Sequence, residues 1–384
     1  MEFESSLQRI FIEIHIIHSV SASRINRDRE SKLKTIIFGG QKRVRLSAAT
    51  QKRATRIFTR ENQLLHKDHQ AQRSRQLAKK VIELLGTTEF GQIELEQATL
   101  LTERAFAAIG MPLDKRQFNE YLIFHSEIEL KAFCQAIFQC QDQLTHWEYS
   151  GSDKKKIKDS FPKEQQRLLA SVFELQRNLE LALYGRHLAD LPLGKVDGEV
   201  LMMHAFSVHA MYDETDFFAS IDDYAPDDEA DAGMLKDLGI ASPTFYRFSA
   251  INLGSLAQQI KSDELAKLGA SAFIQSFVLG LPSGGNHSYF ANTPPVYVLI
   301  QLVKNNPTNM AAAFERSIIA PRNRSMSEVA IEQLEKWVLK CQKRYPLLAP
   351  LHRSCINLTE FASQFDNDPE KSLEDIINEI LKKA

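Results

Sequence analysis

The residues of this chain best suited to chemistry are cations that repeat first at strand spacing and then at helix spacing. Arg43 and Arg45 are two residues apart, so both side chains leave the same face of a strand. Lys52, Arg53 and Arg56 follow, with Lys52 and Arg56 one helical turn apart. A nucleic-acid backbone presents regularly spaced phosphates to such a row of cations. The spacing therefore predicts a site for an extended polyanion, and the alternative is a solvated basic face without a ligand.

The charge of the chain is distributed unevenly. Its 384 residues carry a formal net charge of −2, yet residues 1–80 contain 18 Lys and Arg against 7 Asp and Glu. The rest of the chain contains 29 against 42. A basic segment on a nearly neutral chain indicates a local anion site and not a protein that coats DNA. A helix that begins near Ser47 would add free backbone N–H groups and a favourable dipole to this site.

Composition also excludes several classes of protein. The four cysteines contain no Cys-x-x-Cys pair, so we expect neither a structural zinc site nor a disulfide framework. The acidic first residues lack a signal-peptide core, and no apolar run approaches the length of a membrane span. We therefore expect a cytoplasmic protein without a metal, a cofactor or a membrane partner.

The order of expected elements favours an α+β fold. Alternating apolar residues predict strands over 10–17, 35–38 and 42–46, and buried strands over 245–253 and 296–303. Residues 60–190 are expected to be helical throughout, with one amphipathic helix that carries Leu168, Val172, Leu175, Leu179 and Leu183. Later helices are expected near 262–280, 325–344 and 369–383. Between Asp213 and Asp231 lies an acidic loop without Lys or Arg.

A collinear series of motifs covers nearly the whole chain. The N-terminal motifs are Asn26-Arg27-Asp28, Phe38-Gly39-Gly40, Arg43-Val44-Arg45 and Lys52-Arg53. The later ones are Tyr184-Gly185-Arg186, Gly194-Lys195-Val196-Asp197-Gly198, His204-Ala205, His209, Asp216-Phe217-Phe218, Asp222-Asp223, Phe245-Tyr246-Arg247, Ile251-Asn252-Leu253 and Ala313-Phe314-Glu315. In order and spacing they resemble the CasC family, the backbone subunits of the type I-E CRISPR surveillance complex Cascade.

This resemblance implies a fold shaped like a right hand. An RRM-like (ferredoxin-like) palm would comprise residues 1–59, 190–210 and 241–384. A helical insertion, 60–189, would form the fingers, and 211–240 a protruding thumb hairpin. The implied protein is a non-enzymatic subunit that binds guide RNA and oligomerises head to tail along it for pairing with target DNA. Its implied partners are other copies of itself and the large, small and RNA-end-binding Cascade subunits.

The resemblance also implies particular contacts. The residues expected to bind RNA are Asn26, Arg27, Lys34, Arg43, Arg45, Ser47, Lys52, Arg53, Arg56, Arg186 and His187. Lys154, Lys155 and Lys158 are expected to touch target DNA, and a solvated helix start is the alternative for this cluster. Phe217 and Phe218 are expected to displace bases from the thumb. The alternative is that one phenylalanine anchors the acidic loop to the core.

Two rival functions remain open. His15 and His18 could form an acid–base pair for sequence-independent RNA cleavage. Structural histidines near a strand end are the alternative. The second rival is a single-copy RNA-binding module that does not assemble.

Overall fold

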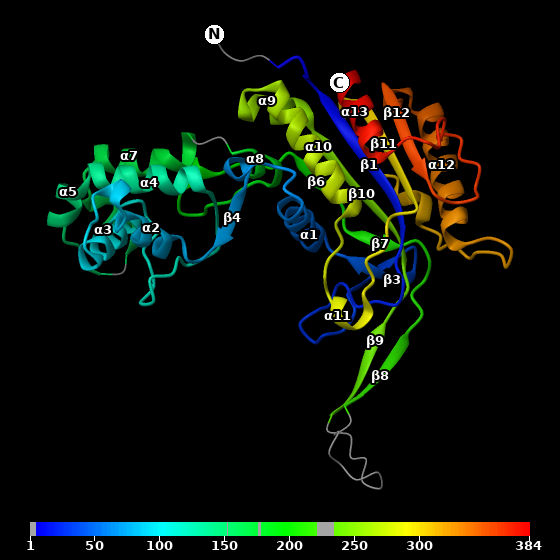
Figure 1. Cartoon of the computed structure of the whole chain (residues 1–384), viewed down its shortest axis with the longest axis horizontal. Helices are drawn as coiled ribbons and strands as arrows, with labels where there is room; N and C mark the ends of the chain where they lie inside the picture. Colours follow the sequence, from blue (N-terminus) through cyan, green and yellow to red (C-terminus); the bar gives the residue numbers. More distant parts are fainter. Residues whose placement is uncertain (1–4, 152, 176–177, 221–233) are drawn as a thin grey trace, which may run out of the picture. The chain divides into compact units, whose positions relative to one another are not determined.

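The computed structural model describes residues 5–151, 153–175, 178–220 and 234–384, which fold into two compact units (Figure 1). The sheet unit contains residues 5–64, 200–255 and 270–384. The helical unit contains residues 65–199 and 256–269. The helical unit thus extends past the expected segment 60–189 and also includes a later part of the chain.

An antiparallel sheet of eight strands organises the sheet unit (Figure 1). The strand order is β12 (His352–Asn357), β11 (Tyr297–Lys304), β1 (Ile10–Ser19), β10 (Thr244–Asn252), β7 (Ala205–Ser207), β3 (Gln41–Leu46) and β2 (Thr35–Phe38), and β6 (Val200–Met202) also pairs with β10. The α+β class is confirmed. The sequence predicted no bounds for β6 or β7 and did not reveal β12.

Helices cover both faces of this sheet (Figure 1). In the sheet unit they are α1 (Ala48–Glu61), the second part of α10 (Asp263–Leu279), α12 (Met326–Arg344) and α13 (Leu373–Lys383). The same unit contains the short helix α11 (Asn286–Tyr289), while most of α9 (Leu253–Ile260) belongs to the helical unit. On β10, Tyr246 and Phe248 pack in one cluster with α12, while Arg247 points to the other face and meets the end of α10. A strand buried on both faces has apolar residues in nearly every position, which explains the run predicted over 245–253.

A separate hairpin follows β7. Its strands, β8 (Glu214–Ser220) and β9 (Met234–Ile240), form a two-stranded sheet of their own in register from Glu214↔Ile240 to Ser220↔Met234. Figure 1 shows this hairpin leaving the sheet beside β3 and α11. Residues 221–233, which hold most of the expected acidic loop, lie outside the described residues.

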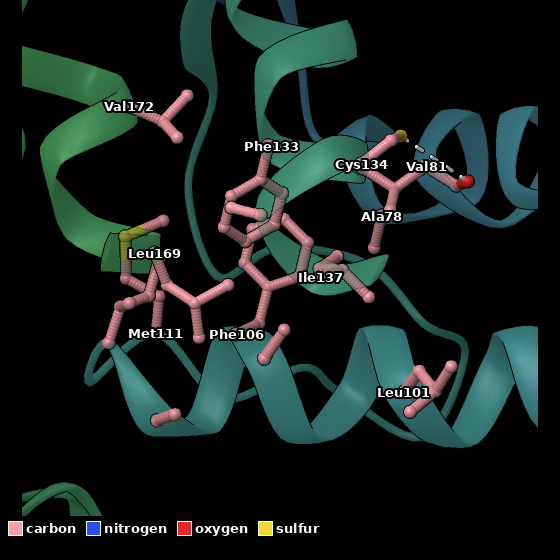
Figure 2. Close-up of a cluster of buried hydrophobic side chains, with 14 of the residues drawn as sticks. Ala78, Val81, Leu101, Phe106, Met111, Phe133, Cys134, Ile137, Leu169 and Val172 are labelled. Carbon is pink, nitrogen blue, oxygen red and sulfur yellow. Dashed lines mark hydrogen bonds between the residues drawn. The ribbon is translucent and has the colours of Figure 1, made fainter. Parts of the chain in front are cut away.

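The helical unit has its own hydrophobic core (Figure 2). Its helices are α2 (Leu77–Leu85), α3 (Leu95–Ala108), α4 (Glu127–Gln139), α5 (Gln141–His146), α6 (Lys154–Ser160), α7 (Lys163–Leu175) and α8 (Leu179–Tyr184). Short 3-10 helices in the chain are η1 (Lys67–His69), η2 (Thr88–Phe90), η3 (Pro192–Gly194), η4 (Ala311–Phe314) and η5 (Pro346–Leu348). At the core, the ring of Phe133 lies 5.0 Å from that of Phe106 and 5.4 Å from that of Phe173.

Two expectations for this region were wrong. The segment is not wholly helical, because β4 (Ala71–Ser74) pairs with β5 (Ile123–Ser126). The single amphipathic helix is divided into α7 and α8. Asn178 begins α8: its side chain accepts from the Leu181 N–H at 3.1 Å and donates to the Asp68 carbonyl at 2.9 Å. Both bonds favour a helix start, so the apolar spacing continues while the helix does not.

The turn between β2 and β3 gives a testable stability prediction. Gly39 and Gly40 both have positive φ, +58° and +74°, as a tight hairpin turn requires. A Cβ on Gly39 would lie 1.6 Å from the Glu315 carbonyl oxygen, whereas one on Gly40 meets nothing within 4 Å. We expect Gly40→Ala to cost about 1–2 kcal/mol from the left-handed conformation alone. Gly39→Ala should cost several kcal/mol more in urea unfolding, and equal losses would contradict this close contact.

Candidate nucleic-acid interface

A hydrogen-bonded junction joins the loop after β1 to the start of α1. The Ser47 N–H donates to Asn26 Oδ1 at 3.0 Å, and Asn26 Nδ2 donates to Thr50 Oγ1 at 3.1 Å. The Ser47 hydroxyl caps α1 by accepting from the Thr50 N–H. Asn26 and Ser47 are both buried. The structure therefore brings these two predicted residues together and uses their side chains to fix the helix start.

Predicted cations surround this junction. The Arg45 N–H donates to the Lys34 carbonyl at 2.8 Å, and the Lys34 N–H donates to the Asn26 carbonyl at 2.9 Å, which ties the loop to β3. Arg27 and Arg53 are exposed, and Arg45 and Lys34 are half-buried. The other predicted cations of α1 are Lys52 and Arg56, both half-buried, and Lys52 Nζ donates to the Val200 carbonyl. The sequence correctly placed these cations beside a helix N-terminus.

Arg43 is a correction to the predicted set. Its side chain is fully buried and donates to the carbonyls of Ser207 at 3.0 Å, Phe314 at 3.2 Å and Glu315 at 3.2 Å. Burial lowers the pKa of this guanidinium. Arg43 therefore holds β7 and the η4 segment against β3 and has no surface for a phosphate. The two-residue spacing predicted that Arg43 and Arg45 lie on the same face of a strand. It could not show that the rest of the chain covers the Arg43 side chain on this face.

Arg186, in the helical unit, is a second correction. It is buried and forms an ion pair of 2.7 Å with the buried Glu129. Its guanidinium also donates to the carbonyls of Gly194, Phe124 and Phe173. The neighbouring His187 is exposed. Of this predicted pair, His187 alone presents its side chain to solvent.

The three predicted lysines of α6 differ in their surroundings. Lys154 pairs with Glu120 and, at 3.7 Å, with Asp190. Lys155 is exposed and Lys158 is half-buried. The Asp153 side chain caps the helix by accepting from backbone N–H groups. Lys154 is therefore charge-balanced, which leaves Lys155 and Lys158 as the members better suited to a polyanion.

The β8–β9 hairpin carries the predicted aromatic pair. The Phe217 side chain is 65% exposed, which excludes the alternative that it anchors the hairpin to the core. Phe218 pairs with Lys236 in the β8–β9 ladder, and its side chain lies outside the described ones. At the base of the hairpin, Lys42 Nζ lies 3.0 Å from Asp213 Oδ1.

Sequence reasoning missed a cavity of about 1190 Å³ beside this base. It is lined by the loop after β1, the start of β3, both hairpin strands and α11, and two of its residues are Arg24 and Tyr289. Arg24 is 6% exposed, and its Nε has no hydrogen-bond partner among the described residues. The Tyr289 hydroxyl donates to Asp216 Oδ2 at 2.8 Å. The one sequence signal was that Arg24 starts the same basic run as Arg27.

His15 and His18 do not form an acid–base pair. They are three residues apart on β1, which places them on opposite faces of the sheet. His15 hydrogen-bonds with the Tyr246 hydroxyl at 3.0 Å and lies 3.4 Å from Glu13. His18 accepts from Arg247 at 2.9 Å. Both imidazoles are fully buried, so this geometry gives no support to the nuclease alternative.

His18 should make stability depend on pH. Burial, with a smaller effect of the Arg247 charge, lowers its pKa from 6.5 to about 3. The unfolded chain therefore binds a proton that the folded chain excludes, and stability should fall by about 1.4 kcal/mol per pH unit as pH drops below 6.5. In urea unfolding, His18→Asn should remove this part of the slope. A slope unchanged by His18→Asn would contradict the shift.

The described part of the chain contains no group of three or more His, Cys, Asp and Glu that could hold a metal ion. Within the same residues, no helix is long and apolar enough to span a membrane.

Comparisons with known proteins agree on one fold. The family model described as CT1975-like protein matches residues 12–381. A chain of a "CRISPR RNA-guided surveillance complex, pre-nicking" superposes with a TM-score of 0.80 and 23% identity over 97% of this chain and 99% of that one. A chain of a "CRISPR RNA-guided surveillance complex" gives 0.73 and 21% over 97% and 100%. No curated protein sequence matches. Since the family model covers nearly the whole chain, this protein belongs to the CT1975-like family.

Proposed function

We propose that this chain binds guide RNA as a backbone subunit of a CRISPR surveillance complex. The carrying observation is the junction at the start of α1, where Asn26 and Ser47 are locked by hydrogen bonds and Arg27, Arg45 and Arg53 lie around them. Cations fixed beside a helix N-terminus suit the phosphates of single-stranded RNA. The fold shared with surveillance-complex chains over 97% of this chain supports the same role.

The proposal assigns a part to each region. The sheet unit is the RRM-like palm, the helical unit forms the fingers, and β8–β9 is the thumb whose Phe217 and Phe218 displace bases. Copies assemble head to tail along the RNA, in a type I-E Cascade with large, small and RNA-end-binding subunits. Lys155 and Lys158 then contact target DNA as mobile point charges. The exposure of Phe217, Lys155 and His187 supports these roles.

In this proposal the chain is not an enzyme. Base pairing by the guide supplies sequence specificity, and the protein holds the RNA backbone. The separate, buried positions of His15 and His18 favour this role over RNA cleavage.

One purification tests the proposal. The chain should be expressed together with its complex and a CRISPR transcript, and the copurifying nucleic acid should be sized and sequenced. We expect RNA of uniform length with the guide sequence, and a particle mass equal to several copies per RNA. A single copy per RNA would support the non-assembling module, and shortening of added RNA would support the nuclease. Absence of RNA would overturn the proposal.

A further inference from the structure

Phe290 combines exposure with an unfavourable backbone conformation. Its side chain is 72% exposed, although it is a large apolar group directly after α11. Its backbone is left-handed, with φ 40° and ψ 58°. For a residue other than glycine, such a conformation costs of order 1–3 kcal/mol and persists where the surroundings enforce it. The chain therefore holds an aromatic ring in solvent at an energetic cost.

The surroundings enforce this position from both sides. The preceding residue, Tyr289, is attached to the hairpin through its hydrogen bond to Asp216. The following residue, Ala291, is 3% exposed and packs in a core cluster with Val44 and Phe245. The Phe290 N–H donates to the Asn286 carbonyl at 3.0 Å. Phe290 is thus presented on a fixed frame and is not a side chain of a loose loop.

The segment that holds Phe290 lies against the predicted RNA-binding loop after β1. A Cβ on Gly284 would lie 2.8 Å from the Ile25 carbonyl oxygen, so the turn before α11 touches the segment that continues into Asn26 and Arg27. Ser288 and Tyr289 line the cavity that Arg24 also lines, and Phe290 directly follows them. The guanidinium of Arg24 is held beside the cavity by donation from Nη2 to the Ser31 carbonyl at 2.6 Å.

The charges around the cavity favour a neutral ring as its occupant. Its cations are Arg24, Arg27, Lys32 and Lys42, and its carboxylates are Asp28, Glu30, Asp213, Glu214, Asp216 and Asp237. Lys32 is paired with Glu30 and Lys42 with Asp213. Carboxylates are therefore in excess, which disfavours a phosphate. A nucleobase carries no charge, has acceptors for a guanidinium donor, and stacks on aromatic rings whatever its identity.

We propose that Phe290 stacks on a nucleobase of the bound RNA strand at the rim of this cavity. The inference rests on the proposed function, because it places a base contact beside the phosphate contacts of Arg27, Arg45 and Arg53. Stacking involves no ion release, so it contributes affinity without contributing to the salt dependence. A loss of affinity without a change in salt dependence therefore distinguishes the role of Phe290 from that of the cations.

The test measures binding of single-stranded RNA by the purified full chain, freed of copurifying RNA, over a range of salt concentrations. Phe290→Ala should weaken binding roughly fivefold to a hundredfold, as loss of one stacked base does, with an unchanged salt slope. Phe290→Tyr should bind as the wild type does. Phe290→Asn, which tolerates the left-handed conformation, should keep or raise thermal stability and still lose affinity. The control Leu351→Ala removes a leucine 57% exposed and should change nothing.

A second measurement locates the contact. RNA with 2-aminopurine at successive positions should change fluorescence at particular positions, and Phe290→Ala should abolish that change. If the wild type binds RNA and Phe290→Ala binds equally well, the inference fails while the proposed function stands. Loss of copies from the complex without loss of RNA affinity would show that Phe290 contacts protein, which also overturns the inference. If the wild type binds no RNA, both fail.

Discussion

The substitution Arg247→Met should cost roughly 3–5 kcal/mol of folding free energy, the range typical of breaking a buried charged network. Arg247 is 1% exposed, and its guanidinium donates to the carbonyls of Phe277 at 2.5 Å and of Val278 and Gly280 at 3.4 Å each. It also donates to His18 and lies 4.7 Å from the centre of the Phe277 ring. Methionine fills much of the same volume but leaves these carbonyls buried without donors.

Burial of the Arg247 charge opposes the stabilisation that its hydrogen bonds provide. It lowers the pKa of Arg247 to about 9, so the charged form is costly in this site. The matched control is Arg353→Met, since Arg353 is half-buried and its guanidinium is less enclosed. In urea unfolding we expect a loss of about 1 kcal/mol for the control. A loss for Arg247→Met no larger than that would mean that desolvation cancels the hydrogen bonds.

The second large effect concerns RNA affinity. The triple variant Arg27→Ala, Arg45→Ala, Arg53→Ala should lower the slope of log affinity against log salt by about 2, because each single-strand phosphate contact contributes about 0.7. Arg27 and Arg53 are exposed, and Arg45 is half-buried. Fluorescence anisotropy with single-stranded RNA between about 50 and 200 mM salt measures this slope.

The control for this triple variant removes the same charge elsewhere. Lys343, Lys382 and Lys383 lie in the last turns of α12 and α13 and are all exposed. Their replacement by alanine should leave the slope within error of the wild type. Equal slopes for both triple variants would refute a local site at α1 and would indicate a response to net charge alone.

The sequence predicted the elements whose side chains repeat regularly. The strands β1, β10 and β11 are nearly continuous apolar runs. It missed β12, because this edge strand carries His352, Arg353 and Asn357, which hide the alternation. The new helix start at Asn178 was missed, since the Asp68 carbonyl that holds the Asn178 side chain lies about a hundred residues earlier.

The residues of the candidate site also divide into those that the sequence predicted correctly and those whose role depends on distant parts of the chain. Ser47 was found from the local sequence, because the Thr50 N–H that it caps is close by. Asn26 was found only from the motif that resembles the family, because its partners Ser47 and Thr50 lie in a later segment. The burial of Arg43 was not predictable, because its acceptors Phe314 and Glu315 come from a segment about 270 residues later and are backbone carbonyls. The residue type shows that an arginine is charged, but only the tertiary fold determines whether its guanidinium is exposed to solvent.

The position of β1 has a consequence for synthesis of the chain. β1 lies between β10 and β11, with Phe11 opposite Asn252 on one side and Val303 on the other. At ribosomal rates of roughly 5–20 residues per second, β10 is synthesised on the order of ten to fifty seconds after β1, and β11 is synthesised later still. Nearly the entire helical unit is made in that interval. Premature termination near residue 240 would release a chain with the apolar strand Ile10–Ser19 unpaired at both edges, a template for aggregation.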